Sequence, residues 1–177
     1  MSSALAGFIR TIPDHPKPGI QFRDITTLLS EPAGLKLAVD GIADRFSSDV
    51  IDVVVGIEAR GFIFGTAIAY RLGLGFVPLR KQGKLPGQTI GRDFELEYGT
   101  DRIELHVGAI KAGQRVLLVD DLIATGGTAE AGVLLLRESG AEIVECDFVI
   151  SLPDLGGVKR LEALGCPVHA LCEFAGE

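Results

Sequence analysis

The sequence predicts an α/β fold: a doubly wound, mainly parallel sheet with an antiparallel flap and an N-terminal cap. Strands are predicted at residues 50–57, 76–79, 116–119, 143–152 and 168–174. Helices are predicted between them, at residues 61–72, 129–139 and 153–164. Helical crossovers between successive strands indicate parallel pairing. Two segments, 94–98 and 102–107, alternate apolar and polar residues instead, which is typical of antiparallel strands with one face in water.

The first 34 residues form the predicted N-terminal cap. Apolar residues at helical spacing predict a short amphipathic helix over residues 3–12. Three prolines between residues 13 and 18 exclude a helix there and impose an extended path. Asp24 is placed to cap a short turn at residues 26–30. Pro32 then opens a helix whose apolar residues share one face.

Composition indicates a globular chain with one hydrophobic core. Its 177 residues are 47% hydrophobic and 23% charged, and no repeat or linker interrupts them, so we expect a single domain spanning 1–177. Acidic residues outnumber basic ones, 24 against 17, for a formal net charge of -7. Because phosphate backbones and anionic membranes attract clustered lysine and arginine, this balance argues against nucleic acid and membrane partners.

The cysteines and the N-terminus predict a cytoplasmic location. Cys146, Cys166 and Cys172 are dispersed in apolar surroundings and form no Cys-x-x-Cys pair. This pattern favours reduced core thiols over a disulfide framework or a zinc site. No signal-like N-terminus and no apolar run of membrane-spanning length is visible.

Residues 116–128 combine an apolar strand, two acids and a small-residue turn that leads into a helix. Asp120 and Asp121 end the apolar run. The turn consists of Ala124, Thr125, Gly126, Gly127 and Thr128. At the carboxyl end of a parallel strand, such a turn offers free backbone N–H groups and hydroxyls to a phosphate. An ordinary strand–turn–helix connection explains one capping threonine and one glycine but not the paired acids. The spacing fits neither a Walker A loop nor a dinucleotide fingerprint.

A second turn and a basic segment supply candidate cations. Arg60 lies on a glycine-flanked turn after the strand at 50–57, where its guanidinium fork can reach a diphosphate. Lys81 and Lys84 lie in segment 81–91, which is rich in glycine, proline and lysine and predicts a mobile loop. An exposed arginine and a solvated loop are the plainer interpretations. A shared anion site is favoured because both strand ends open on the same edge of the sheet.

These motifs resemble the phosphoribosyl diphosphate signature of the type I phosphoribosyltransferases, with its apolar strand, paired acids and Thr-Gly-Gly-Thr turn. Segments at 22–25 (Phe-Arg-Asp-Ile), 80–87 (Arg-Lys-Gln-Gly-Lys-Leu-Pro-Gly) and 96–99 (Leu-Glu-Tyr-Gly) resemble the adenine-specific members of that family. The resemblance covers about residues 12–173. It implies the type I phosphoribosyltransferase fold, a homodimer and a cis peptide bond at Glu58–Ala59. It also implies an enzyme of purine salvage that transfers the 5-phosphoribosyl group from 5-phosphoribosyl 1-diphosphate to adenine, giving AMP and diphosphate.

The resemblance assigns parts of the chain to the base. Residues 1–34 are the expected base-binding cap, with Phe22 as a stacking face and Arg23 beside it. Residues 81–107 are the expected mobile loop and flap, where Glu97 is the candidate general acid or base. Plainer interpretations make Phe22 a core anchor and Glu97 a solvated strand acid.

Asp120 and Asp121 are the candidate catalytic acids at the ribose. As acceptors they can hold its hydroxyls, and their charge favours an oxocarbenium-like state. The 5′-phosphate is expected on residues 124–128. Carboxylates about 5 Å away repel it by about 3 kcal/mol per charge pair, while a helix N-terminus returns only about 0.3–1 kcal/mol. We therefore expect Mg²⁺, with no direct protein ligand, bound mainly by substrate oxygens and water. The departing diphosphate is expected on Arg60, Lys81 and Lys84.

Three other functions stay open on the sequence alone. The nearest is a phosphoribosyltransferase for another base, namely hypoxanthine–guanine, xanthine or orotate. A regulator that senses phosphoribosyl diphosphate without catalysis would carry a nucleic-acid-binding region or a basic face, and neither is visible at a net charge of -7. A dinucleotide-dependent oxidoreductase is disfavoured by the missing glycine fingerprint.

Overall fold

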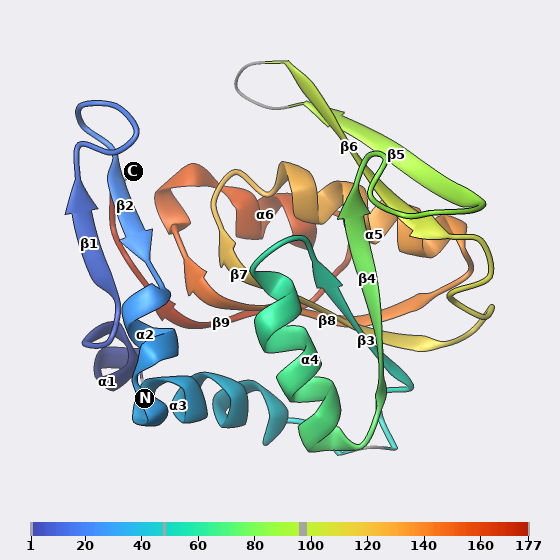
Figure 1. Cartoon of the computed structure of the whole chain (residues 1–177), viewed down its shortest axis with the longest axis horizontal. Coiled ribbons are helices and arrows are strands. Elements are labelled where there is room, and N and C mark those ends of the chain that lie inside the picture. Colours follow the sequence, from blue (N-terminus) through green and yellow to red (C-terminus); the bar gives the residue numbers. More distant parts are fainter. Residues whose placement is uncertain (1, 48, 96–98, 177) are drawn as a thin grey trace.

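The computed structural model describes residues 2–47, 49–95 and 99–176, and it confirms a mainly parallel α/β fold (Figure 1). The large sheet contains β3 (Val53–Ile57), β4 (Gly75–Lys81), β5 (Thr89–Glu95), β6 (Thr100–His106), β7 (Arg115–Ile123), β8 (Glu142–Ser151) and β9 (Val168–Glu173). Its order is β5-β6-β4-β3-β7-β8-β9. The strands from β4 to β9 in this order pair in parallel. Residues of β3 are almost fully buried, as the unbroken apolar run predicts.

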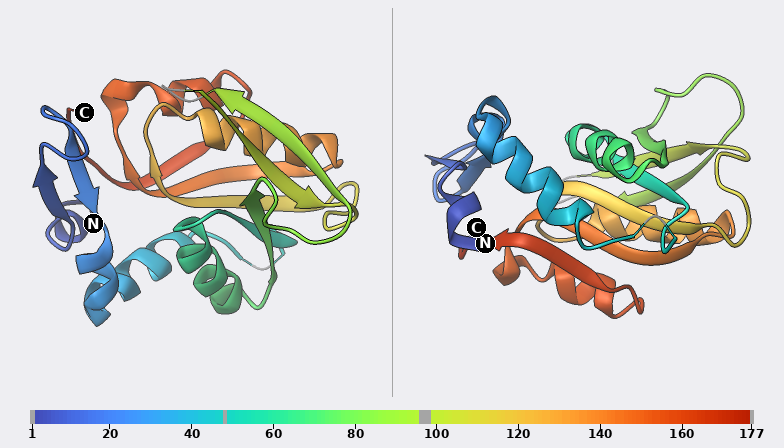
Figure 2. Two further views of the ribbon diagram at one scale, coloured as in Figure 1. Left: turned by 45° about the horizontal axis from the view of Figure 1, so that its top comes forward. Right: turned by 90° about the horizontal axis from the view of Figure 1, so that it is seen from below.

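Helices cover both faces of this sheet (Figure 2). One face carries α3 (Pro32–Ala43) and α4 (Gly61–Leu72), with α1 (Ser2–Ala6) and α2 (Thr26–Ser30) beside them. The other face carries α5 (Gly127–Glu138) and α6 (Gly157–Glu162), preceded by the 3-10 turn η1 (Pro153–Leu155). Alternate residues of the central strands enter the two cores: Leu118 packs with α5, and Val119 packs with α4. Among the described residues, no helix has the length and apolar character needed to cross a bilayer.

The winding of the sheet reverses between β3 and β7. The chain runs from β3 through α4 to β4 on one side, and from β7 through α5 to β8 on the other. The two strands pair directly, with Gly56, near the carboxyl end of β3, opposite Val119, the residue before the two acids of β7. In open α/β sheets such a reversal leaves a crevice at the carboxyl ends of the strands. The turns that follow β3 and β7 therefore flank the expected ligand site.

The flap is an antiparallel extension of the sheet beyond β4. β5 and β6 pair along seven residue pairs, from Thr89 opposite His106 to Glu95 opposite Thr100. β6 joins β4 through two pairs alone among the described residues, Arg80 with Glu104 and Lys81 with Ile103. Figures 1 and 2 show the two flap strands projecting over α5. The predicted strand at 94–98 lies partly outside the described residues, and the predicted loop at 81–91 gives way to β5 at Thr89.

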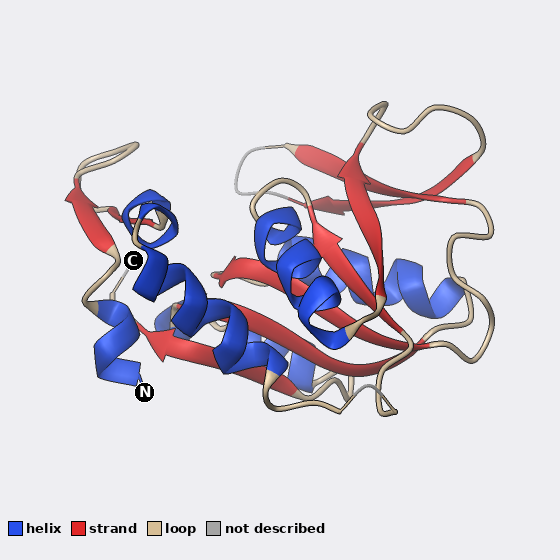
Figure 3. Cartoon of the chain, turned by 60° about the horizontal axis from the view of Figure 1, so that its bottom comes forward, coloured by secondary structure: helices blue, strands red, loops and turns tan. Residues whose placement is uncertain are grey.

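The predicted helix over residues 3–12 is wrong beyond Ala6. The chain forms a second, two-stranded sheet from β1 (Arg10–Pro13) and β2 (Gln21–Asp24), which stands at the end of the molecule opposite the flap (Figure 3). Arg10 Nε donates to Asp24 Oδ2 at 3.1 Å, and this contact with the guanidinium lowers the pKa of Asp24 to about 2. Pairing with β2 thus overrides the apolar helical spacing, a tertiary effect that one segment's pattern does not report.

Two further boundaries differ from the sequence prediction. β7 continues through the acids to Ile123, because β8 extends the ladder as far as Ser151. The predicted helix at 153–164 is divided by Gly156, whose φ of 76° belongs to the left-handed region. The other predicted strands and helices occur within a few residues of their expected positions.

Candidate functional site

A cavity of about 340 Å³ opens where the winding of the sheet reverses. It is lined by Ile57, Glu58, Ala59, Arg60, Lys81, Phe94, Asp101, Ile103, Asp120, Asp121 and Thr128. A smaller cavity of about 130 Å³ adjoins it and shares Asp120 and Thr128. The smaller cavity is otherwise formed by residues 122–127 and Ala129. Both cavities therefore lie at the carboxyl end of β7, where the acidic pair meets the small-residue turn.

The acidic pair is held by the turn that follows β3. Asp121 is buried, and its Oδ2 lies 2.6 Å from Nε of Arg60. The backbone N–H of Asp121 donates to Asp120 Oδ1 at 2.8 Å. Burial raises the pKa of Asp120 well above its ordinary value, and the nearby charge of Asp121 raises it further, while Arg60 acts in the opposite sense. The pair thus needs a cation, and a guanidinium from the neighbouring strand end provides one.

Gly61 allows α4 to begin directly against the acids. A Cβ at this position would lie 2.7 Å from the carbonyl oxygen of Val119 and 2.9 Å from Asp120 Oδ1. The carbonyl belongs to the β7 ladder and the carboxylate accepts the Asp121 N–H, so neither oxygen can move away easily and this close approach requires glycine. The positive end of the α4 dipole consequently lies beside a carboxylate, which is a favourable arrangement.

The turn between β3 and α4 is fixed to the end of β4 by Glu58. Its carboxylate accepts hydrogen bonds from the Lys81 backbone N–H at 3.0 Å and from Arg80 Nε at 3.1 Å. Burial acts to raise the pKa of Glu58, but these hydrogen bonds outweigh it and leave the pKa below its ordinary value. The expected cis peptide bond at Glu58–Ala59 is present. Glu58 therefore orients the strand end from which Lys81 reaches the cavity.

The small-residue turn lies tightly against the start of α6. Gly157 N–H donates to the carbonyl of Ala124 at 2.9 Å. A Cβ on Gly157 would lie 2.3 Å from that carbonyl oxygen, and one on Gly126 would lie 2.9 Å from Gly157 Cα. Gly126 has a φ of 79°, which a glycine adopts at little cost as the chain enters α5. The free N–H groups at the start of α5 are thus presented beside the smaller cavity.

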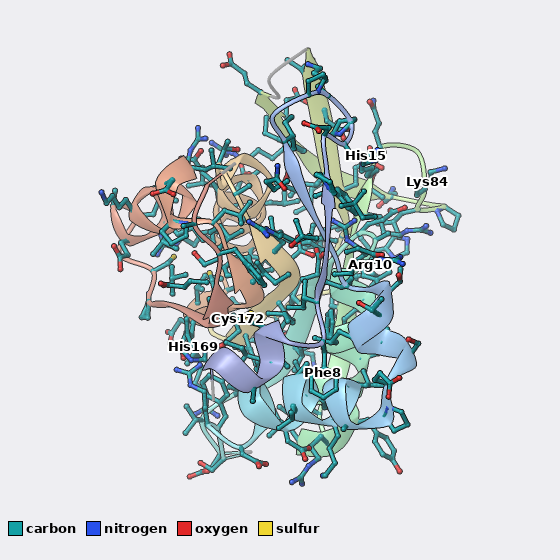
Figure 4. The ribbon with its side chains drawn as sticks, turned by 90° about the vertical axis from the view of Figure 1, so that its left-hand side faces the viewer. Phe8, Arg10, His15, Lys84, His169 and Cys172 are labelled. Carbon is teal, nitrogen blue, oxygen red and sulfur yellow. The ribbon has the colours of Figure 1, made fainter. Side chains whose placement is uncertain are left out.

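The structure brings most of the predicted site residues to these two cavities. Arg60, Lys81, Asp120, Asp121 and Thr128 line the larger one. Ala124, Thr125, Gly126 and Gly127 line the smaller one. Glu97 lies outside the described residues. Lys84 does not line either cavity of the described structure; it lies on the exposed loop after β4 (Figure 4).

Phe22 and Arg23 also lie away from the two cavities, on β2 of the N-terminal hairpin. The Phe22 ring meets the ring of His15 edge to face, with centroids 5.2 Å apart. The Arg23 guanidinium stacks on Phe174 at 4.5 Å and donates to the carbonyl of Ala175. The side chain of Arg23 therefore ties the hairpin to the C-terminal segment, and its backbone remains the part that faces a ligand in the sequence-based hypothesis.

Two residues of the larger cavity carry no signal that the sequence analysis used. Asp101, at the start of β6, lies opposite Phe94 in the ladder, and its Oδ2 is 3.3 Å from Nζ of Lys81. Glu58 appears in the sequence analysis only as one residue of the expected cis peptide bond. Both are acids in short polar segments, and their place in the cavity depends on strand register and on a turn conformation. Pattern and spacing alone do not report either feature.

Comparison with known proteins finds consistent relatives along nearly the whole chain. The model of the phosphoribosyl transferase domain matches residues 24–166. A protein of Nitrosospira multiformis named adenine phosphoribosyltransferase is 64% identical, covering 95% of this chain and 96% of its own. The crystal structure of adenine phosphoribosyltransferase from Rhodothermus marinus superposes with a TM-score of 0.90 at 52% identity, covering 97% of each chain. That of the Saccharomyces cerevisiae enzyme, complexed with an imino-altritol bisphosphate and adenine, gives 0.83 at 37% identity, covering 96% of this chain and 99% of its own.

Asp120→Asn is expected to stabilise the ligand-free protein. A raised folded-state pKa means that the folded state keeps a proton that the unfolded state releases above about pH 4. The contribution of Asp120 to the free energy of unfolding therefore falls as the pH rises from about 4 towards the raised pKa. The amide introduced by Asp120→Asn does not ionise, so the variant avoids that loss. A gain of about 1 kcal/mol would raise the melting temperature by about 2–4 °C at this chain length.

Differential scanning calorimetry at pH 5 to 8 measures this effect. The melting temperature of the Asn variant should exceed that of the parent by more at pH 8 than at pH 5. Asp52→Asn is the control: Arg115 lowers the pKa of Asp52 to about 2, so this substitution should lower the melting temperature instead. A lower melting temperature for Asp120→Asn than for the parent would contradict a raised pKa at Asp120.

Proposed function

This chain belongs to the phosphoribosyl transferase domain family and, within it, to the adenine phosphoribosyltransferases, and we propose that the two joined cavities are its active site. The reaction transfers the 5-phosphoribosyl group from 5-phosphoribosyl 1-diphosphate to adenine, giving AMP and diphosphate. High identity over nearly the full chain favours this activity over transfer to another base and over a regulator without catalysis. The observation that carries the site assignment is the meeting of paired acids, a phosphate turn and two cations on adjoining cavities.

Asp120 and Asp121 are assigned to the ribose. As the bond from the anomeric carbon to diphosphate breaks, positive charge develops on the ring. Two carboxylates in a recessed site stabilise that charge more strongly than they would in water, and they can accept hydrogen bonds from the ribose hydroxyls. Both acids line the larger cavity, and Asp120 also lines the smaller one. This supports the assignment, since the ribose joins the 5′-phosphate to the diphosphate.

The 5′-phosphate is assigned to residues 124–128 and the smaller cavity. Free N–H groups at the start of α5 and the hydroxyls of Thr125 and Thr128 supply donors for its oxygens. The diphosphate is assigned to Arg60, Lys81 and Lys84. In the structure, Arg60 pairs with Asp121 and Lys81 pairs with Asp101. When diphosphate binds, Arg60 and Lys81 therefore exchange these carboxylates for oxygens of the diphosphate.

The base is assigned to the N-terminal hairpin and the flap. Phe22 offers a ring face for stacking, and the backbone at Arg23 offers polar groups to the edge of the base. Glu97 is proposed as the general acid or base, and Glu97→Gln should then lower kcat with little change in stability. These assignments divide one phosphoribosyltransferase domain, residues 1–177, into a base-binding cap at 1–34 and a loop and flap at 81–107.

Mg²⁺ is the proposed cofactor, and the carboxylates at the site suit it because Mg²⁺ prefers oxygen ligands. No group of three or more His, Cys, Asp or Glu side chains in the described part of the chain could hold a metal. Four carboxylates of the described residues line the larger cavity, but those of Glu58, Asp101 and Asp121 are each paired with a cation of the protein, so the ion would be held mainly by substrate oxygens and water. Once bound, it would neutralise the negative charge that substrate and carboxylates share.

The homodimer is proposed from an exposed face of α4, and the cytoplasmic location is proposed from the free cysteines. α4 presents Ile63 and Tyr70 to solvent on one face, with Tyr70 89% exposed, and we assign this face to the interface of a homodimer. Cys146, Cys166 and Cys172 are all free thiols, which fits the reducing environment of the proposed cytoplasmic location.

A base panel tests the proposed function. Purified protein with 5-phosphoribosyl 1-diphosphate and Mg²⁺ should release a nucleotide and diphosphate with adenine, and not with hypoxanthine, guanine, xanthine or orotate. Chromatographic detection of AMP measures it. EDTA should abolish AMP formation, and excess Mg²⁺ should restore it. Turnover of another base in preference to adenine would refute the base assignment, and full activity in EDTA would refute the metal.

Asp101→Asn is expected to tighten binding of inorganic diphosphate. The substitution frees Lys81 from the carboxylate with which it pairs. Exposed ion pairs of this kind are worth about 0.2–1 kcal/mol, or up to about fivefold in affinity. Isothermal titration calorimetry with diphosphate and Mg²⁺ measures the change. Asp93→Asn is the matched control on the flap, since Asp93 pairs with Arg102 instead. Weaker binding by the Asp101 variant would show that Asp101 helps to hold the ligand.

The double variant Ile63→Glu/Tyr70→Glu is expected to convert a dimer to a monomer. Two like charges on the facing α4 surfaces would repel across a twofold interface. Sedimentation velocity at micromolar concentration measures the change. Val107→Glu, which alters an exposed apolar residue elsewhere, should leave the dimer intact. A parent protein that sediments as a monomer would refute the proposed homodimer.

A further inference from the structure

The proposed phosphate turn carries an acid on its own helix. Glu130 lies in the first turn of α5, and its backbone N–H donates to the carbonyl of Gly126 at 2.8 Å. A carboxylate here is favourable for an isolated helix because it faces the positive end of the dipole. It is unfavourable for a helix whose N-terminus receives a phosphate, because both groups are negative. The site therefore requires a cation close to Glu130.

Arg160 of α6 provides that cation. Its Nε lies 2.6 Å from Glu130 Oε2, and its Nη1 donates to the carbonyl of Thr125 at 3.4 Å. The same guanidinium passes 3.7 Å from where a Cβ of Gly127 would lie. It thus contacts both the turn and the first turn of α5. α5 and α6 lie side by side on one face of the sheet (Figures 1 and 2).

The position of Arg160 is fixed from behind. α6 begins at Gly157, which packs against Ala124 with no room for a side chain. One helical turn later, Arg160 projects back over the same turn of the chain. The anchor at Gly157 and the guanidinium at Arg160 therefore hold the turn from two sides. A third cavity, of about 310 Å³, borders Arg160, Glu130 and Gly127 under the flap, so the guanidinium remains partly open to water.

We propose that Arg160 is a positioning residue for the 5′-phosphate. It neutralises Glu130 and engages the outward carbonyl of Thr125, which leaves the N–H groups and hydroxyls of the turn directed to the anion. This role rests on the proposed binding of the 5′-phosphate at residues 124–128. Arg160 does not touch the reacting atoms, so it acts on affinity for the phosphate and not on the chemistry at the anomeric carbon.

A purely structural ion pair makes different predictions. The side chains of Arg160 and Glu130 are 47% and 27% exposed, and pairs with this exposure contribute little to folding. If Arg160 served only the fold, its removal would change thermal stability slightly and leave phosphate affinity unaltered. If it serves the phosphate, its removal leaves Glu130 unpaired beside the anion, and affinity falls while stability is preserved.

The test compares Arg160→Ala, Glu130→Gln, the double variant Arg160→Ala/Glu130→Gln, Arg160→Lys and the control Lys159→Ala, which alters the neighbouring exposed cation. Calorimetric titration with ribose 5-phosphate measures affinity for the 5′-phosphate without diphosphate. We expect Arg160→Ala to weaken binding about tenfold, as for loss of one close charge interaction. The double variant and Arg160→Lys should recover most of that loss. Lys159→Ala should bind like the parent.

Kinetics give a second readout. Arg160→Ala should raise KM for 5-phosphoribosyl 1-diphosphate and leave kcat and the KM for adenine nearly unchanged. Equal ribose 5-phosphate affinity in Arg160→Ala and Lys159→Ala would overturn the proposal, as would a double variant as weak as the single one. A parent protein that binds no ribose 5-phosphate would instead refute the proposed phosphate site. Should Arg160→Ala fold poorly, Arg160→Gln takes its place: it must bind ribose 5-phosphate more weakly than Arg160→Lys does, and equal affinity of these two variants would overturn the proposal.

Discussion

The architecture of this site depends on two adjacent carboxylates at the end of β7. Asp121 is buried and Asp120 is half-buried beside it, and two charges in such a place require compensation. The compensation comes from Arg60, on the turn after the neighbouring strand, at 2.6 Å from Asp121. This contact is possible because β3 and β7 pair in register and because α4 starts at a glycine. Strand pairing, turn conformation and the small size of Gly61 together make this charge compensation possible.

Two helices, one from each face of the sheet, approach the end of β7 through glycines. Gly61 brings α4 to the acids, and Gly157 brings α6 to residues 124–128, the turn proposed to bind the 5′-phosphate. A methyl group at either position would meet backbone or carboxylate oxygen at less than 3 Å. Asp120 and Asp121 supply acceptors, and the turn at residues 124–128 supplies donors. Although these two parts of the site are close in the sequence, a different helix packs against each of them. This arrangement keeps negative carboxylates and an anion-binding turn close together without merging them.

The sequence predicted the features that depend on local patterns. The apolar run, the paired acids and the small-residue turn placed the site at the end of β7, and resemblance indicated the cis bond at Glu58–Ala59 correctly. The strand β1 was missed because its pairing with β2 is a contact between segments, and the spacing of its apolar residues suits a helix equally well. Asp101 and Arg160 were missed for the same reason. The register of the flap strands brings Asp101 to Lys81, and the packing of α6 brings Arg160 to Glu130 of α5. Neither contact can be inferred from the residues next to it in the sequence.

The narrow junction between flap and parallel sheet gives Lys81 two roles in one residue. It is the last residue of β4 and forms one of the two described pairs that join β4 to β6, while its ammonium group lies 3.3 Å from the Asp101 carboxylate. The residue that joins the flap to the parallel sheet thus also lines the cavity with the charge proposed to bind the diphosphate, so a change in the position of the flap would also change the electrostatic potential of the cavity.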